Sequence, residues 1–419
     1  MFLSDLNLTV DCLKAVSLDW EKSIKSMPEE IPFLEKPEYM RCYKMTKAAD
    51  DLEAALDEIA TQIKKSPALK ALFWHTHCKV AYYENTSFSN WPKIFPAFGK
   101  NSGMFYFFVA LSLIDVYGEV FRGKGIPEEY IQACAMWTGG TLHIHRSGND
   151  GIPGMDKQQI HWIRHYIDYK LFRCGRFEYM NQHLPSWCPE VFRRKEDGVT
   201  IALCPQGTRL DAEGFCLYRD EEEKDAFLVT KLTKTDSYTE GTPILSSGTA
   251  LIDTVVRLSL TEWTRLLGPG DFTPGVHIPA GGGMSPERCK ESFEDALNFY
   301  KKYFPELNVK AFICESWIFS PDYERLMPES NLAKFMRELY LFPCSAGGKD
   351  GMFFLFGQEP DDHKDLPRDN SVRRAMLSIL DEGKRLHTGG MLFLVDDIDK
   401  FGTKYYRSQF QIPKDIIVK

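Results

Sequence analysis

A run of glycines between an apolar strand and a helix start constrains this chain more than any other stretch. Residues 275–288 read GVHIPAGGGMSPER, which predicts a short strand, a three-glycine turn and a helix that extends to about residue 303. Ser285 suits a helix N-cap and Pro286 suits the first helical position, and apolar residues follow at helical spacing. The stretch therefore predicts a strand and a helix joined by a turn whose backbone a ligand can approach closely.

This turn also has the chemistry of an anion site. The free N–H groups of a first helical turn point at such a ligand, with the positive end of the helix dipole behind them. Arg288 lies in that first turn, where the dipole disfavours a cation unless an anion is held nearby. The spacing matches neither the GxxxxGK[ST] of a P-loop nor the GxGxxG of a dinucleotide loop. Two interpretations stay open at this point: an anion-binding turn, and a glycine-rich turn without a ligand.

Length and charge limit the class of protein. A chain of 419 residues is too long for one ordinary core, so we expect two domains. The net charge of −8 argues against nucleic acid and against an anionic membrane as partners. The eleven cysteines are scattered singly without a CxxC pair, and the N-terminus has no basic region followed by an apolar run. We expect a reduced, cytoplasmic protein; its oligomeric state stays open.

The hydrophobic pattern changes along the chain. Residues 1–180 are mainly of helical period, with an amphipathic pattern at 44–65, a segment at 104–120 that is apolar nearly all round, and a last helix at 158–173. After about residue 185 segments of period two are separated by turn residues, which predicts hairpins. They lie at 199–203, 214–218 and 226–230.

Beyond residue 258 strands and helices alternate. We predict helices at 260–267, 285–303, 330–340 and 371–384, and strands at 308–318, 351–357 and 391–395. Hairpins followed by strand–helix units indicate an α+β fold with helices on a mixed sheet. We therefore expect a helical N-terminal domain over residues 1–190 and a mixed-sheet domain over residues 191–419.

One carboxylate stands out in the second half. Glu315 lies in the otherwise apolar segment KAFICESW, where an unpaired carboxylate would be costly to bury. It is either paired with a cation for structural reasons or held with a raised pKa as an acid–base group. His277, on the strand before the glycine turn, and Tyr323, shortly after Glu315, are the other titratable candidates within reach.

Histidine pairs are the remaining candidates for chemistry. Six of the ten histidines occur as pairs, at 75 and 77, 143 and 145, and 161 and 165. A pair at i, i+4 on a helix can share a metal, but HExxH and a third ligand are missing, as are a calcium-loop frame and a GxSxG elbow. We predict no metal site, so a metal-dependent hydrolase is the weakest functional alternative.

Six segments carry a resemblance to a known family. They are VHIPAGG at 276–282, ESWI at 315–318, PESN at 328–331, FRCGRFEY at 172–179, EGTPI at 240–244 and LPRDNS at 366–371. They resemble a bacterial acyltransferase family whose members pair a helical N-acyltransferase N-terminal domain with a GNAT-like C-terminal domain. The resemblance covers roughly residues 160 to 390.

The resemblance implies the geometry of the site. In the GNAT superfamily two central parallel strands splay apart, the pantetheine of acyl-CoA lies between them, and the pyrophosphate rests on the loop and helix after the first strand. Here the strands would be 276–280 and 311–317, and Pro279 fits because proline interrupts ladder pairing. The implied cofactor-binding residues are Ala280, Gly281, Gly282, Gly283, Ser285 and Arg288. The chain departs from the usual [QR]xxGx[GA] loop, because His277 stands where Gln or Arg is usual.

The resemblance also implies a mechanism. An amine attacks the thioester carbonyl while a base accepts its proton and a backbone N–H polarises the carbonyl. Glu315 or His277 would be the base, and Tyr323 the acid that returns a proton to the CoA thiolate. The resemblance thus implies an N-acyltransferase that uses acetyl-CoA or another acyl-CoA and acylates a small-molecule amine. The alternative is a non-catalytic ligand-binding or regulatory protein on the same scaffold, which the atypical loop favours.

Overall fold

The computed structural model describes residues 3–84 and 86–418 and forms two compact units. Unit 1 is the chain up to Arg173 together with Pro279–Gly281 and Phe354–Gln358. Unit 2 is Cys174–Ile278, Gly282–Phe353 and the chain from Glu359. The predicted boundary near residue 190 thus falls after strand β2 (Phe177–Met180), which belongs to the main sheet of unit 2.

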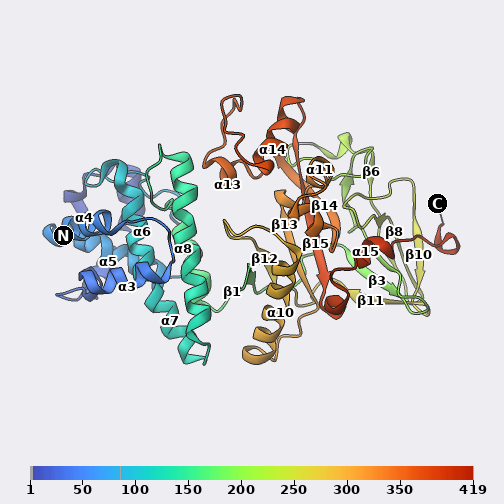
Figure 1. Ribbon diagram of the computed structural model, residues 1–419, viewed down its shortest axis with the longest axis horizontal. Helices are drawn as coiled ribbons and strands as arrows, with labels where there is room; N and C mark the ends of the chain where they lie inside the picture. Colours follow the sequence, from blue (N-terminus) through green and yellow to red (C-terminus); the bar gives the residue numbers. More distant parts are fainter. Residues whose placement is uncertain (1–2, 85, 419) are drawn as a thin grey trace. The chain divides into compact units, whose positions relative to one another are not determined.

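Unit 1 is helical, as the period of its sequence predicts (blue to green in Figure 1). Its helices are α1 (Val10–Ser17), α2 (Trp20–Lys25), α3 (Lys36–Met45), α4 (Glu53–Lys65), α5 (Pro67–Ala81), α6 (Ser102–Ser112), α7 (Ile114–Gly123), α8 (Glu128–Gly148) and α9 (Arg164–Ile167). The helix predicted over 158–173 is shorter than expected. A 3₁₀ helix (Gln159–Ile163) runs into α9, which ends at Ile167, and a strand, β1 (Leu171–Cys174), follows.

The apolar segment predicted as one buried helix is two consecutive core helices. The stretch Gly99–Gly123 has a mean hydropathy of 1.6 and the length of a membrane span, yet 78% of its most apolar window is buried inside unit 1. The core of a folded unit accounts for such a helix. The break comes at Leu113, directly after Ser112, whose hydroxyl donates to the Val109 carbonyl at 2.6 Å and so competes with the helical ladder.

Helix α8 contains two adjacent glycines with opposite surroundings. A Cβ on Gly139 would lie 2.8 Å from the backbone carbonyl oxygen of Thr46, whereas a Cβ on Gly140 would meet no atom within 4 Å. Glycine in a helix interior costs roughly 0.5–1 kcal/mol relative to alanine. Close helix packing explains Gly139, but nothing in the packing of the described residues requires Gly140.

The two glycines form a matched pair for a stability test. We expect Gly140→Ala to raise the free energy of unfolding by about 0.5–1 kcal/mol, because it gains helix propensity without a clash. We expect Gly139→Ala to lower it by about 1–3 kcal/mol, because α8 must move away from Thr46. Urea unfolding followed by circular dichroism measures both changes. Equal effects of the two substitutions would contradict this packing.

Unit 2 is built on a six-stranded mixed sheet of order β1-β2-β12-β13-β15-β14. The further strands are β12 (Gly275–His277), β13 (Ala311–Ser316), β14 (Tyr340–Gly348) and β15 (Leu386–Leu394). Helix α10 (Pro286–Tyr303) covers one face, because its Phe293 packs on Phe312 of β13 and Phe393 of β15 with ring centroids 4.9 and 5.2 Å apart. The predicted α+β fold with helices on a mixed sheet is confirmed.

The hairpin region forms three smaller sheets in unit 2. Their orders are β11-β3-β4-β9, β10-β8-β7 and β5-β6. The strands are β3 (Glu190–Arg194), β4 (Thr200–Leu203), β5 (Arg209–Leu210), β6 (Leu228–Val229), β7 (Thr233–Lys234), β8 (Tyr238–Gly241), β9 (Pro243–Ile244), β10 (Val256–Ser259) and β11 (Trp263–Leu267). A core of inward side chains joins the first two sheets; among them are Phe192, Ile201, Leu203, Leu258 and Trp263.

Three short elements differ from their predicted type. Residues 214–218, predicted as a strand, form only an isolated bridge between Cys216 and Leu210. The helix predicted at 260–267 is strand β11, whose Trp263 is buried in that core. The strand predicted at 351–357 is helix α13 (Met352–Phe356). Periodicity does not separate helix from strand in apolar runs of this length. The other helices of unit 2 are α11 (Pro321–Leu326), α12 (Asn331–Met336), α14 (Ser371–Asp381) and α15 (Tyr405–Ser408).

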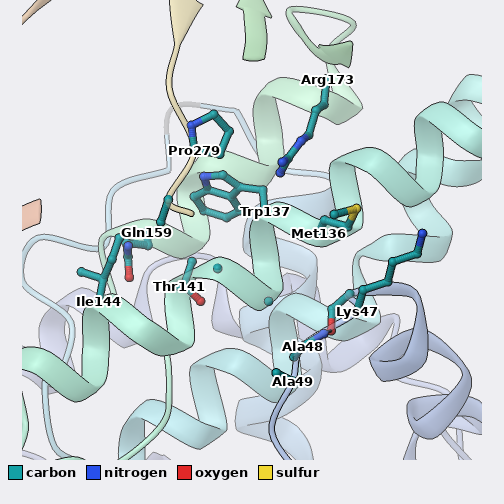
Figure 2. Close-up of a pocket in the computed structure, with 14 residues that line it drawn as sticks. Lys47, Ala48, Ala49, Met136, Trp137, Thr141, Ile144, Gln159, Arg173 and Pro279 are labelled. Atoms are coloured by element: carbon teal, nitrogen blue, oxygen red, sulfur yellow. Dashed lines mark hydrogen bonds between the residues drawn. The ribbon is translucent and has the colours of Figure 1, made fainter. Parts of the chain in front are cut away.

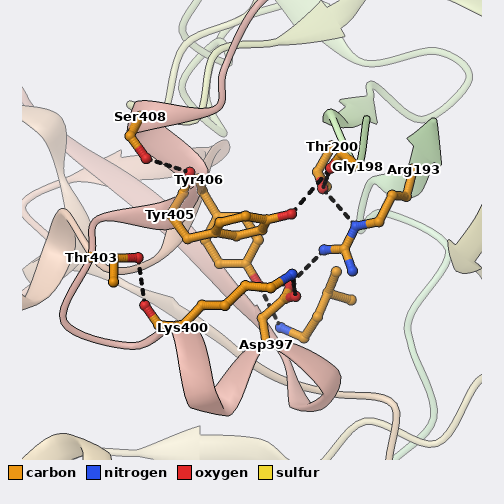
Figure 3. A network of polar contacts seen from close by, with 10 residues as sticks. Arg193, Gly198, Thr200, Asp397, Lys400, Thr403, Tyr405, Tyr406 and Ser408 are labelled. Atoms are coloured by element: carbon orange, nitrogen blue, oxygen red, sulfur yellow. Dashed lines mark hydrogen bonds and ion pairs between the residues drawn. The ribbon is translucent and has the colours of Figure 1, made fainter. Parts of the chain in front are cut away.

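A polar cluster around Asp397 joins the C-terminal segment to the sheet β11-β3-β4-β9 (Figure 3). Asp397 is 1% exposed and accepts hydrogen bonds from Arg193 of β3 at 2.5 Å, from Lys400 at 2.9 Å and from Tyr406 at 2.9 Å. Three donors compensate the burial of one carboxylate. We assign the cluster a role in stability, because the hydrogen-bonding groups of Asp397 are occupied by Arg193, Lys400 and Tyr406.

Candidate functional site

Strands β12 and β13 are joined only near their amino ends. The Lys310 N–H donates to the Phe272 carbonyl at 3.0 Å and the Ile313 N–H to the Pro274 carbonyl at 3.2 Å. Gly275 is the single residue of β12 with a parallel register partner in β13, and that partner is Ile313.

Beyond that point each strand follows its other neighbour. β12 stays paired with β2 as far as His277, opposite Glu178. β13 stays paired with β15 as far as Ser316, opposite Gly389. The two parallel strands therefore separate toward their carboxyl ends, which is the position where open sheets of this kind take ligands.

The register fixes the direction of the His277 side chain. Val276 lies opposite Tyr179 of β2, and the Tyr179 hydroxyl shares a 2.9 Å hydrogen bond with Ser292 of α10. Opposite residues share a face and consecutive residues alternate. Val276 therefore faces α10, and His277 points to the other face of the sheet, as does its partner Glu178, which is 1% exposed.

Glu315 projects from the same face as His277. Gly275 and Ile313 are register partners, His277 is two residues beyond the first and Glu315 two residues beyond the second. The period of two places both side chains on one face, at the same level, on either side of the separation. The register thus places two of the three titratable residues predicted from the sequence on the same face of the sheet.

Glu315 is partly exposed, and its nearest cation is distant. Its side chain is 34% exposed, and its Oε1 lies 4.0 Å from Arg219, which is closer, at 3.4 Å, to Asp350. Burial raises the pKa of Glu315 above its ordinary value, Arg219 opposes that rise and Asp350 adds to it. Glu315 therefore combines a long ion pair with a pKa raised in the direction that an acid–base role requires.

Glu315 lines a cavity of about 430 Å³ in unit 2. Phe342 and Cys344 of β14 form part of its wall, together with Cys216. Trp187 also lines it and is 48% exposed. Arg209 and Arg219 line it as well, so the lining mixes apolar side chains with two cations and the Glu315 carboxylate. A cavity of this size suits a small ligand or one group of a larger ligand.

Tyr323, the third titratable residue predicted from the sequence, is buried. It lies in α11, is 2% exposed, and packs edge-on against Trp317 with ring centroids 6.0 Å apart. Burial raises the pKa of its hydroxyl far above the ordinary value. It does not line the cavity that Glu315 lines.

The glycine turn after β12 has a backbone that other residues would resist. Gly281, Gly282 and Gly283 have φ of 80°, 80° and 67°, in the left-handed region that favours glycine. Helix α10 then begins at Pro286, and the Ser285 hydroxyl accepts the Arg288 N–H at 3.4 Å as predicted for an N-cap. The loop presents exposed backbone immediately before the positive end of an 18-residue helix.

Two guanidinium groups converge on this loop. Arg288 donates to the Gly282 carbonyl, and Arg176 donates to the Gly283 carbonyl at 2.6 Å. Arg176 is only 6% exposed and lies in the turn between β1 and β2. Because β2 runs antiparallel to β12, this turn lies beside the end of β12 and the glycine loop that follows it. Sequence reasoning missed Arg176: it belongs to the FRCGRFEY segment, but no motif places that segment beside the glycines. Two cations at a helix N-terminus give the loop the electrostatics of an anion site.

Most of the paired histidines are packed inside unit 1, whereas His143 is exposed. His77 bonds Ser112 at 2.8 Å, and burial lowers the pKa of His77 to about 4 and that of His75 to about 3. His161 and His165 lie edge to face with ring centroids 5.9 Å apart. In the described parts of the chain no three His, Cys, Asp or Glu side chains are grouped as metal ligands.

Comparison with known proteins gives one family and one fold. Residues 171–392 match the family model described as GNAT-like C-terminal domain. No curated protein matches the chain. An acyltransferase solved in complex with decanoyl-CoA and teicoplanin is 17% identical, with a TM-score of 0.60, over 94% of this chain and 98% of that one.

Two further solved structures agree with that fold. An acyltransferase in complex with CoA and 10C-teicoplanin is 16% identical with a TM-score of 0.60, and an acyltransferase mutant in complex with octanoyl-CoA is 17% identical with a TM-score of 0.59. Each covers 94% of this chain and 98% of its own. At such low identity the likeness is one of fold.

Proposed function

The chain belongs to the family defined by a GNAT-like C-terminal domain, and from that premise we propose that it is an acyl-CoA-dependent acyltransferase. One observation carries the proposal: β12 and β13 separate directly before a glycine loop on which two guanidinium groups converge. An acyl-CoA needs both parts, because its pantetheine is a narrow chain and its pyrophosphate a multiply charged anion. The solved structures of the same fold are titled acyltransferases and hold CoA or acyl-CoA, which supports the proposal.

In this proposal the glycine loop holds the pyrophosphate. Gly282 and Gly283 let the phosphates approach the backbone, and Arg176 and Arg288 exchange their loop carbonyls for phosphate oxygens. Ser285 caps the helix whose N-terminus faces the anion. Ala280 and Gly281 complete the predicted loop.

Glu315 is the base of the proposed reaction. The nitrogen lone pair of an amine attacks the thioester carbonyl carbon, the carbon–sulfur bond breaks, and the proton of the amine passes to Glu315. The raised pKa of this carboxyl suits a base that works near neutral pH. His277, on the same face, is the second candidate for this role or for holding the attacking amine. Because Tyr323 is buried, Glu315 or solvent returns the proton to the CoA thiolate.

The acyl group and the acceptor remain predictions. Two of the solved acyltransferases hold decanoyl-CoA or octanoyl-CoA, whose acyl groups are longer than the acetyl group predicted here. Two hold teicoplanin or 10C-teicoplanin, which are larger than a small amine. We propose that the cavity beside Glu315 receives the part of the acceptor that carries the amine.

Release of free CoA thiol tests the function. The purified protein is mixed with acetyl-, octanoyl- or decanoyl-CoA and a panel of primary amines, and thiol is measured together with the mass of the amine. We expect one thiol for each acylated amine, because direct attack leaves no covalent enzyme intermediate. The non-catalytic alternative predicts that CoA binds and that no amine in the panel raises thiol release above the rate in buffer.

A further inference from the structure

A second cavity lies in unit 1. It measures about 250 Å³ and opens between α8 and the chain after α3 (Figure 2). Trp137, Gly140 and Ile144 of α8 form one wall, and the others come from residues 46–49, Gln159, Arg173 and residues 279–280. Its volume is just below the roughly 300–1,000 Å³ typical of pockets for drug-sized ligands, so a compact ligand fits.

One wall is open because a side chain is missing there. A Cβ on Gly140 would meet no atom within 4 Å, so a larger residue fits this helix position, and glycine is the least favourable residue there apart from proline. The neighbouring Gly139 also lines the cavity, but its contact with Thr46 explains it. The absence of a side chain at Gly140 keeps space that the fold itself does not use.

The cavity combines a flat apolar surface with one unpaired cation. The half-buried indole of Trp137 stands in its centre, and the Arg173 guanidinium points toward that indole (Figure 2). In the described part of the chain Arg173 has no ion pair and no side-chain hydrogen bond, and the described lining residues include no carboxylate. Lys47, also a lining residue, points away from the indole, so Arg173 is the cation that faces the space (Figure 2).

We propose that this cavity is a second small-molecule site, for an anion with a flat apolar body. The ring of the ligand lies along Trp137 in the space left by Gly140, and its carboxylate or phosphate accepts the two parallel N–H bonds that a guanidinium offers. The site goes beyond the proposed acyl transfer. It shares Ala280 with the start of the glycine loop, but it uses neither Arg176 and Arg288, which would hold the pyrophosphate, nor the cavity beside Glu315.

Three naphthalene probes test the site by calorimetric titration of the full chain. 2-Naphthoate and 2-naphthyl phosphate carry the anion, and 2-naphthamide is the neutral analogue of the same shape. We expect at least one anion to bind about ten- to a hundredfold more tightly than the amide, the range of a charge-assisted contact. Preference for the phosphate would identify a phosphorylated ligand, and preference for the carboxylate an arylcarboxylic acid.

Two variants assign the binding to this cavity. Arg173→Gln should reduce the affinity for the preferred anion to that for 2-naphthamide, and Gly140→Leu should weaken all three probes by filling the space. Gly282→Asp, in the glycine loop, should leave all three affinities unchanged. Thermal melting checks that each variant is folded. Equal binding of anions and amide by the wild type, or full anion affinity in a folded Arg173→Gln variant, would overturn the proposal.

Discussion

Replacing Glu315 with Gln is expected to slow acyl transfer by roughly 10²- to 10⁴-fold, the range that a positioned general base contributes. The amide keeps the shape of the side chain but cannot accept the proton of the attacking amine. The rate of thiol release at saturating acyl-CoA and acceptor measures the effect. The affinity for CoA should stay the same, because Glu315 lies on β13 and not on the glycine loop.

The same role of Glu315 predicts how the wild-type kcat/KM depends on pH. Glu315 is active as the carboxylate, so kcat/KM should fall as the pH drops through the pKa of this group. Because burial raises that pKa, the fall should come at a higher pH than for an ordinary glutamate, and Glu315→Gln should lose it.

Glu240→Gln is the matched control for this substitution. Glu240 lies on β8 and pairs with Arg257 at 2.7 Å, and it does not line the cavity beside Glu315. This control should keep the wild-type rate and pH profile. An unchanged rate in Glu315→Gln would remove Glu315 from the mechanism and leave His277 as the base.

Replacing Gly282 with Asp is expected to weaken CoA binding by about a hundredfold or more, as two charge-assisted contacts are lost. A Cβ on Gly282 would lie 3.3 Å from the Arg288 guanidinium and 3.7 Å from Nε of Arg176. The new carboxylate would pair with these cations and repel the pyrophosphate. Calorimetry with CoA measures the loss.

Gly270→Asp makes the same change away from the loop. Gly270 has φ of 91°, and a Cβ there would meet no atom within 4 Å, so strain and charge match those at Gly282. This control should bind CoA as the wild type does. If Gly282→Asp also keeps its affinity, the pyrophosphate does not rest on this loop.

Local signals predicted the frame of the site. The strand, the glycine turn and the Ser285 cap of α10 lie where residues 275–303 place them, because cap, proline and glycine act within one turn of chain. Short apolar runs carried no such signal. The segment around Trp263 is a strand because it pairs with β3 and packs into the core beside it. These contacts come from distant parts of the chain, so the segment's own residues do not reveal them.

The assembly of the site could not be predicted, because it depends on register. Placing His277 and Glu315 on one face requires the pairing of Gly275 with Ile313, and bringing Arg176 to the glycines requires the pairing of β2 with β12. Neither pairing can be predicted from the residues of one strand, because it joins segments that are far apart in the sequence. The burial of Tyr323 is of the same kind, since its place beside Trp317 is set by tertiary packing.

Calorimetric titration of the wild-type protein with CoA tests the central claim most directly, because it needs no knowledge of the acceptor. We predict one site per chain with micromolar affinity that Gly282→Asp removes and Gly270→Asp retains. An absence of binding heat at millimolar CoA, over a range of temperatures, would contradict the claim and make the glycine loop a turn without a ligand.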